Sequence, residues 1–96
     1  MRVRFSAPAL AELDAILADL GEKNHVAARR FEHRIRGVAE RIGRFPRGFQ
    51  EVEERRGVRR VPLVRYPYLV FYKVYDDEVI VLRIIHGART EPWEDL

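Results

Sequence analysis

Residues 58 to 89, VRRVPLVRYPYLVFYKVYDDEVIVLRIIHGAR, decide the fold. Three runs rich in Val, Ile, Leu, Phe and Tyr are separated by two short turn signals, Tyr66-Pro67 and Asp76-Asp77. Such runs favour a pleated, half-buried surface, and breaks this short are typical of hairpins. The stretch therefore predicts a three-stranded antiparallel meander that ends at His86-Gly87-Ala88-Arg89.

The chain before the meander predicts one short strand and two helices. The first five residues favour an edge strand, and Ser6 is the expected N-cap of a helix. We expect this helix to stop at Gly21, and a second helix, capped by Asn24, to run from about His25 to Arg44. Apolar residues at three- and four-residue spacing predict a buried stripe in each helix: Leu10, Leu13, Ile16, Leu17 and Leu20 in the first, and Ala27, Phe31, Ile35, Val38, Ile42 and Phe45 in the second.

Two helices joined by a few residues pack antiparallel, and their shared apolar face needs a second layer. The meander is the layer available in a chain of this length. The predicted fold is therefore α+β, with the order β-α-α-β-β-β and an antiparallel sheet packed against a helical hairpin. We expect a single domain over residues 1–96, in which the polar segment 46–57 is a surface connection held by Phe49.

Composition limits the classes of function. The chain has no cysteine and three scattered histidines, so we expect neither a metal site nor a cofactor. It has no run of 18 apolar residues and no leader-like segment, so we expect a cytoplasmic chain with no membrane partner. Sixteen arginines against two lysines favour bidentate contacts to phosphate or carboxylate, although a GC-rich genome gives the same composition.

The meander is apolar on both of its predicted faces. A two-residue turn at Asp76-Asp77 places Leu69, Phe71, Ile80, Leu82 and Ile84 on one face, and Tyr68, Val70, Tyr72, Val74, Val79, Val81, Arg83 and Ile85 on the other. An antiparallel sheet normally has one polar face. We therefore expect the tail around Trp93, another chain, or both to cover the second face; strands merely rich in β-formers are the alternative.

The second predicted helix carries a basic strip of Arg30, Arg34, Arg41 and Arg44, with Gly37 among them. These positions fall within about 80° of one another at 100° per residue. The strip suits an acidic partner segment or a phosphate backbone. The alternative is a solvated flank, in which Glu32 and Glu40 lie near Arg36 for i,i+4 pairing.

The end of the last predicted strand holds His86, Arg83 and Arg89, and the further cations expected near it are Arg59, Arg60, Arg65 and Lys73. These groups suit RNA cleavage, because a histidine moves the 2′-hydroxyl proton and arginines stabilise charge on the phosphorus oxygens. A second proton carrier is missing, since the nearest acids lie in the connection at 46–57. The alternative is that His86 is a strand-end residue hydrogen-bonded to backbone.

The element order, the phrase LVFYKVYDDEVIVLRIIHGAR at 69–89 and the break FPRG at 45–48 resemble the RelE/ParE toxin superfamily over nearly the whole chain. The ending LRIIHGAR resembles the ParE-like branch, also known as plasmid stabilisation proteins. This resemblance implies the toxin of a bacterial type II toxin–antitoxin system, which inhibits DNA gyrase and is neutralised by a ParD-like antitoxin. The implied antitoxin-binding residues are Arg30, Arg34, Arg41, Leu69, Phe71 and Tyr72, and the target-binding residues are Arg83, His86, Arg89 and Trp93.

Two other functions stay open at this point. RelE-like members of the superfamily cleave mRNA on the ribosome, and His86, Arg83, Arg65 and Arg89 would then be catalytic. RelE-like nucleases usually carry several sheet cations and a late tyrosine or histidine, whereas here the late tyrosine is missing and Lys73 is the only sheet lysine. The resemblance therefore favours a gyrase poison that is not an enzyme. A non-toxic basic module that binds nucleic acid directly is the third candidate.

Overall fold

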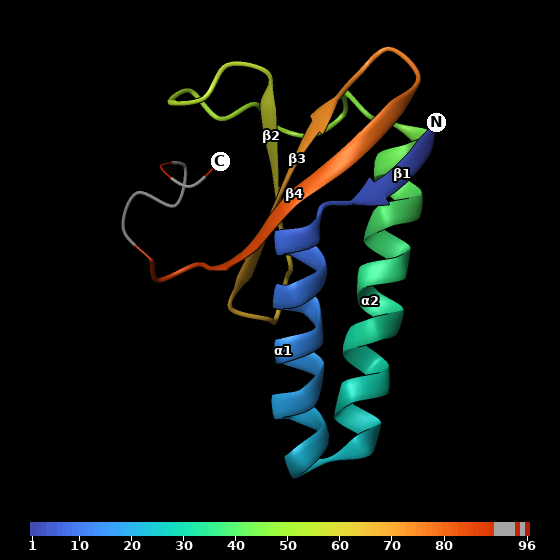
Figure 1. Ribbon diagram of the computed structural model, residues 1–96, viewed down its shortest axis with the longest axis vertical. Helices are drawn as coiled ribbons and strands as arrows, with labels where there is room; N and C mark the ends of the chain where they lie inside the picture. The colour runs from blue at the N-terminus through green and yellow to red at the C-terminus, as the bar shows by residue number, and fades with distance from the viewer. Residues whose placement is uncertain (90–93, 95) are drawn as a thin grey trace.

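In the computed structural model the chain forms two layers, a helical hairpin packed against a sheet (Figure 1). The structure describes residues 1–89, 94 and 96. The element order within them is β1 (Arg2–Phe5), α1 (Ala7–Lys23), α2 (His25–Arg44), β2 (Val58–Pro62), β3 (Tyr68–Val74) and β4 (Glu78–His86). The predicted α+β class and the order β-α-α-β-β-β are confirmed.

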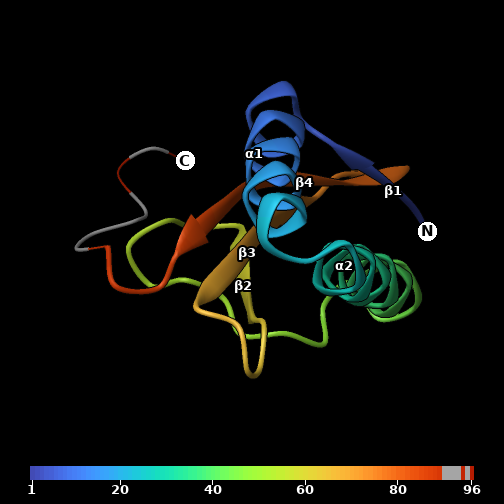
Figure 2. The same cartoon turned by 90° about the horizontal axis from the view of Figure 1, so that it is seen from below.

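Asn24 alone separates the two helices, which corrects the predicted end of α1. Its backbone is extended (φ −165°, ψ 113°), and its N–H donates to the Leu20 carbonyl at 2.8 Å. Its side-chain oxygen accepts from the Val26 N–H at 2.8 Å and thereby caps α2, as predicted. Gly21 consequently lies inside α1 rather than at its end. So short a link places the helices side by side, which the view along their axes makes plain (Figure 2).

The sheet has the strand order β1-β4-β3-β2 within the described residues. Strands β2, β3 and β4 pair antiparallel, as predicted, and β1 is an edge strand, as predicted. However, β1 pairs with β4 in parallel, so the sheet as a whole is mixed rather than antiparallel. The far half of the helical hairpin projects past the sheet (Figure 1).

A β-bulge in β4 corrects the predicted division of the meander into faces. Phe71 pairs with Arg83, but the next residue, Tyr72, pairs with Val81, so Leu82 is an extra residue in β4. The bulge places Ile84 in the main core under the helices and Ile85 on the opposite face, the reverse of the prediction. From Tyr72 to the hairpin at Asp76-Asp77 the predicted register holds, because Val74 pairs with Val79.

The main core lies between the helices and the sheet. Phe31 and Ile42 of α2 are completely buried there, as predicted, whereas two members of the predicted stripes, Phe45 and Leu10, are exposed. Phe45 is 60% exposed because it is the C-cap of α2 and its backbone leaves the helical conformation. Leu10, in the first turns of α1, is 48% exposed.

The chain itself covers much of the opposite face of the sheet. Val52, Val58, Phe71 and Ile85 form a second buried cluster, against which Leu69, Leu82 and Leu96 pack. The connection 46–57 therefore contributes to the core through Val52, and Phe49 anchors it by an edge-on contact with Tyr72 at 6.3 Å between ring centroids. The predicted covering by Trp93 lies outside the described residues. None of the helices in the described part of the chain is long and apolar enough to cross a membrane.

Candidate functional site

The turn between β2 and β3 lies beside the end of β4 and brings part of the predicted site together. Tyr68 pairs with His86, and the Gly87 N–H donates to the Pro67 carbonyl at 2.7 Å. Arg65 lies in this turn with a positive φ of 76°. Arg65, His86 and Arg89 therefore belong to one exposed end of the sheet, as predicted.

The imidazole of His86 is held by the backbone beyond the strand. Its Nδ1 accepts from the Ala88 N–H at 3.1 Å, and its ring meets Tyr68 edge-on at 5.6 Å between centroids. Nδ1 is thus an acceptor, which leaves Nε2 as the nitrogen that carries the proton. Among the described residues no carboxylate hydrogen-bonds to this ring, so the arrangement lacks the acid partner that would orient a general base.

Arg83 is directed away from that end and into contact with α1. Its Nη2 and Nε donate to one carboxylate oxygen of Glu12 at 2.6 and 2.9 Å, and the other oxygen accepts from the Ile84 N–H at 2.9 Å. Both side chains are about four-fifths buried. The hydrogen bond that Arg83 donates to Glu12 raises the pKa of Arg83 above its usual value, so the guanidinium stays charged. This geometry assigns Arg83 a structural role in fixing α1 to β4.

Ser6 completes the same junction. Its hydroxyl donates to the carbonyl of the bulged residue Leu82 at 2.8 Å and accepts from the Ala9 N–H at 3.2 Å as the predicted N-cap. Its own N–H donates to the Val81 carbonyl at 2.9 Å. At the point where β1 ends, the start of α1 therefore supplies hydrogen-bond donors to the carbonyl groups at the edge of β4. Sequence reasoning missed Glu12, because nothing near it in the sequence indicates that it pairs with Arg83.

Of three sheet residues predicted to contact a partner, two are buried and one is half-buried. Phe71 and Tyr72 are 1% and 0% exposed, and Leu69 packs against the second cluster. Burial raises the pKa of the Tyr72 phenol, whose hydroxyl donates to the Pro46 carbonyl at 2.7 Å. The assignment of Phe71 and Tyr72 to an exposed partner surface is therefore corrected: both side chains stabilise the chain itself.

The basic strip of α2 borders a hollow of about 210 Å³ lined by His33, Arg34, Gly37, Val38 and Arg41. Arg34 donates from Nη1 to the Val64 carbonyl at 3.1 Å, and the Arg41 guanidinium lies over the Phe49 ring at 5.5 Å from its centroid. On the neighbouring flank Arg36 pairs with Glu32 at 3.0 Å, as the sequence predicts. Two of the strip's arginines, Arg34 and Arg41, are thus held in place by the chain.

Gly37 forms part of this hollow without any packing requirement for a glycine. A Cβ built at Gly37 meets nothing within 4 Å. We expect Gly37→Ala to increase the free energy of unfolding by about 0.5–1 kcal/mol, because alanine is the better helix former. Urea unfolding followed by circular dichroism would measure the change. Gly43→Ala is the matched control in the same helix: its Cβ would lie 2.7 Å from the Met1 carbonyl oxygen, so that variant should be destabilised. A destabilised Gly37→Ala would contradict the open geometry.

An apolar groove runs between the two helices. Its volume is about 310 Å³, and its apolar walls are formed by Phe5, Leu10, Leu13, Leu17, Ile35 and Ala39. Asp14, Glu32 and Arg36 form its polar rim. We call this feature the helix groove. Leu10 lines it and remains half-exposed.

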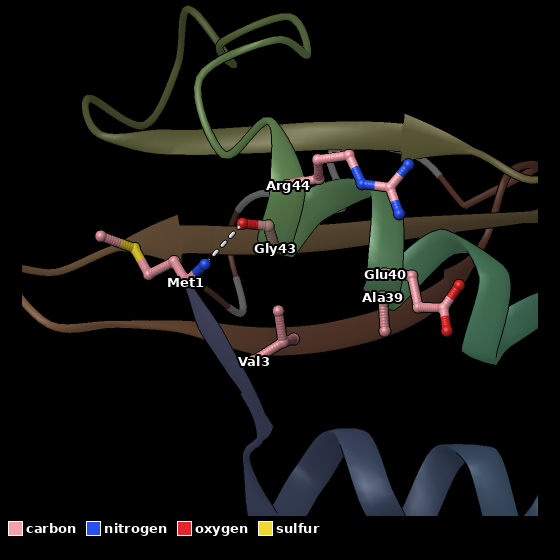
Figure 3. Close-up of a pocket in the computed structure, with 6 residues that line it drawn as sticks. All are labelled: Met1, Val3, Ala39, Glu40, Gly43 and Arg44. Carbon is pink, nitrogen blue, oxygen red and sulfur yellow. Dashed lines mark hydrogen bonds between the residues drawn. The ribbon is translucent and has the colours of Figure 1, made fainter.

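A further hollow of about 520 Å³ lies where β1 passes the end of α2 (Figure 3). The Met1 ammonium donates to the Gly43 carbonyl at 2.8 Å across its floor, and Val3 and Ala39 form its wall. Glu40 and Arg44 also line it (Figure 3). It contains no pair of groups placed for proton transfer. Likewise, no group of three His, Asp or Glu side chains within the described ranges is arranged to hold a metal ion.

Comparison with known proteins identifies relatives of the whole fold. Residues 3–91 match the family model described as the ParE toxin of type II toxin-antitoxin system, parDE. The curated protein Toxin RelE2 of Caulobacter vibrioides is 35% identical over 82 residues, which cover 84% of this chain and 89% of that protein. A solved structure, described as the chromosomal ParDE TA system from P. aeruginosa, aligns with a TM-score of 0.77 at 25% identity, covering 90% of this chain and 95% of that one.

Proposed function

Because the chain belongs to the ParE toxin family of type II toxin–antitoxin systems, we propose that it inhibits DNA gyrase and that a ParD-like antitoxin neutralises it. The observation that carries the choice of target is the pairing of Arg83 with Glu12. It removes one cation from the set that RNA cleavage would need. The described residues hold no complete proton-transfer site, which supports action by binding, and gyrase is the target that the resemblance to the ParE-like branch implies. Its place of action would be the cytoplasm.

The surface proposed for gyrase is the exposed end of the sheet together with the segment that follows β4. His86 and Arg89 are exposed there, and Arg65 adds positive charge. Trp93 follows in the sequence, and tryptophan and arginine are the residue types that most often dominate a binding interface. Arg83 would support this surface indirectly, by holding β4 against α1.

Two assays on the purified chain test the proposal. We expect inhibition of DNA supercoiling by gyrase and no cleavage of mRNA on translating ribosomes. The RelE-like alternative keeps support from one observation, the exposed His86 at the same end of the sheet as Arg65 and Arg89. Cleavage of mRNA that is lost in His86→Gln, with supercoiling unaffected, would establish that alternative and overturn the gyrase assignment.

The helix groove is the surface that we propose for the antitoxin. Antitoxins of this type present an amphipathic segment, and a helix in an apolar groove binds through side chains spaced by three and four residues. The groove offers the exposed Leu10 with Leu13 and Leu17 beside it, and its rim carries both signs of charge. By contrast, Arg30, Arg34 and Arg41, the cations first assigned to the antitoxin, lie on another side of α2.

Replacing Leu10 with glutamine should weaken antitoxin binding about 10-fold, since one apolar anchor contributes about 1–3 kcal/mol. Leu10 is half-exposed, so the fold should tolerate the change. Isothermal titration with the cognate antitoxin would measure the affinity. Val64→Gln is the matched control, because Val64 is also exposed and apolar but lies in the turn between β2 and β3. Equal weakening by both variants would argue against the groove.

A further inference from the structure

The net positive charge of the molecule is concentrated on helix α2. It contains six arginines (Arg29, Arg30, Arg34, Arg36, Arg41 and Arg44) against two glutamates, a net charge of +4. The whole chain has a net charge of +3, so everything outside α2 sums to −1. α1 is acidic, with four carboxylates and one lysine. A charge this concentrated on one helix attracts polyanions far more strongly than the overall charge suggests.

The hollow beside the basic strip has the composition of an anion site. His33, Arg34 and Arg41 supply its polar groups, and none of the residues that line it is acidic. The bond from Arg34 to the Val64 carbonyl and the stacking of Arg41 over Phe49 hold these two side chains in position. A guanidinium held in this way loses less freedom when it binds a ligand, and each keeps several N–H donors for it.

Gly37 opens the hollow to a ligand. A glycine in the middle of an exposed helix costs stability relative to alanine, and no neighbouring atom of this chain requires it. The missing side chain instead allows a bulky group to approach the backbone of α2 between the arginines. A ligand that contacts the backbone at Gly37 would therefore explain why a glycine occupies this position.

From these three observations we propose that the basic strip, centred on Arg30, Arg34, Gly37 and Arg41, binds the phosphodiester backbone of a nucleic acid. An acidic protein segment suits it less, because a helical segment needs apolar anchors and the hollow offers only the largely buried Val38. The apolar anchors lie in the helix groove instead. Phosphate contacts need only cations and close approach, and these are what the strip supplies.

Fluorescence anisotropy with labelled 20-base-pair DNA and RNA duplexes, at 50 and 200 mM salt, tests the proposal. The double variant Arg30→Ala/Arg41→Ala should bind at least about 10-fold more weakly than the unaltered chain and show a smaller salt slope, because two phosphate contacts are lost. Arg29→Ala/Arg36→Ala is the matched control. It removes the same charge from the same helix, but from another flank, where Arg36 already pairs with Glu32, and it should bind almost normally.

Gly37→Met provides a second test that leaves the charge unchanged. Its side chain should fill the hollow and weaken duplex binding at least about 5-fold while the chain stays folded. Comparing the affinities for the DNA and RNA duplexes shows which of the two nucleic acids the strip binds. Equal weakening by the two double-arginine variants, or binding of a polyglutamate peptide in the absence of duplex binding, would overturn the proposal. The gyrase assays do not depend on this outcome, since they can succeed with a chain that binds no free duplex.

Discussion

Replacing Trp93 with alanine is expected to abolish growth inhibition while leaving the fold intact. If Trp93 anchors the contact with the target, its loss should remove 2 kcal/mol or more of binding energy, which is about a 30-fold loss of affinity. Growth of cells that express the variant without antitoxin measures the effect. A folded Trp93→Ala chain that still stops growth would contradict the proposed target surface.

The control for this prediction has to separate binding from folding. A chain truncated after Arg89 should also be non-toxic, but it removes Leu96, which packs against the second cluster, and Glu94, whose carbonyl accepts from Arg55 at 3.3 Å. Leu96→Ala is therefore the matched variant: it removes the packing and keeps Trp93. We expect Leu96→Ala to lower stability and to remain toxic. Toxicity that follows stability across these variants would indicate that the tail acts through the fold alone.

Local signals in the sequence predicted the elements of this fold well. The caps Ser6 and Asn24 and the hairpin at Asp76-Asp77 depend on residues that lie within a few positions of one another. A cap or a two-residue turn is a local hydrogen-bonding problem, so its residue types carry the information. The predicted end of α1 at Gly21 was wrong because a glycine is only a weak stop signal, which the tertiary packing of the helical hairpin overrides. Asn24 ends the helix more effectively.

The division of the sheet into faces was not predictable in the same way. The bulge at Leu82 exists where β1 ends and the start of α1 takes over the edge of β4. That junction joins residues more than 70 positions apart, and no short window of sequence contains both sides. The assignment of Phe71 and Tyr72 to a partner was a separate error, because it came from the family resemblance and the chain buries both side chains itself. Arg65, His86 and Arg89 were placed together correctly because the pairing of β3 with β4 brings the end of β4 beside the turn before β3. Arg59 and Lys73, expected near them, lie toward the other end of β3.

The Glu12 carboxylate is the contact on which the α1–β4 junction depends most. Glu12→Ala removes the acceptor for Arg83 and for the Ile84 N–H, and both groups are largely sheltered from water. We expect the free energy of unfolding to fall by about 2–3 kcal/mol, since a charge-assisted network contributes more than a neutral hydrogen bond and leaving its partners unsatisfied adds a cost. Urea unfolding measures this loss. Asp14→Ala, an exposed acid on the same helix, should change stability by less than about 0.5 kcal/mol.

The double variant Glu12→Leu/Arg83→Met decides whether Arg83 has any role beyond structure. Replacing both charges with apolar side chains of similar size should recover much of the stability lost in Glu12→Ala, because no charge is left without its partner. If Arg83 only fixes β4 to α1, the refolded double variant should inhibit growth as strongly as the unaltered chain. A stable double variant that is no longer toxic would instead place Arg83 in contact with the target. The ion pair would then be a resting arrangement that the target has to displace, and the proposed division between the supporting Arg83 and the binding residues His86, Arg89 and Trp93 would be wrong.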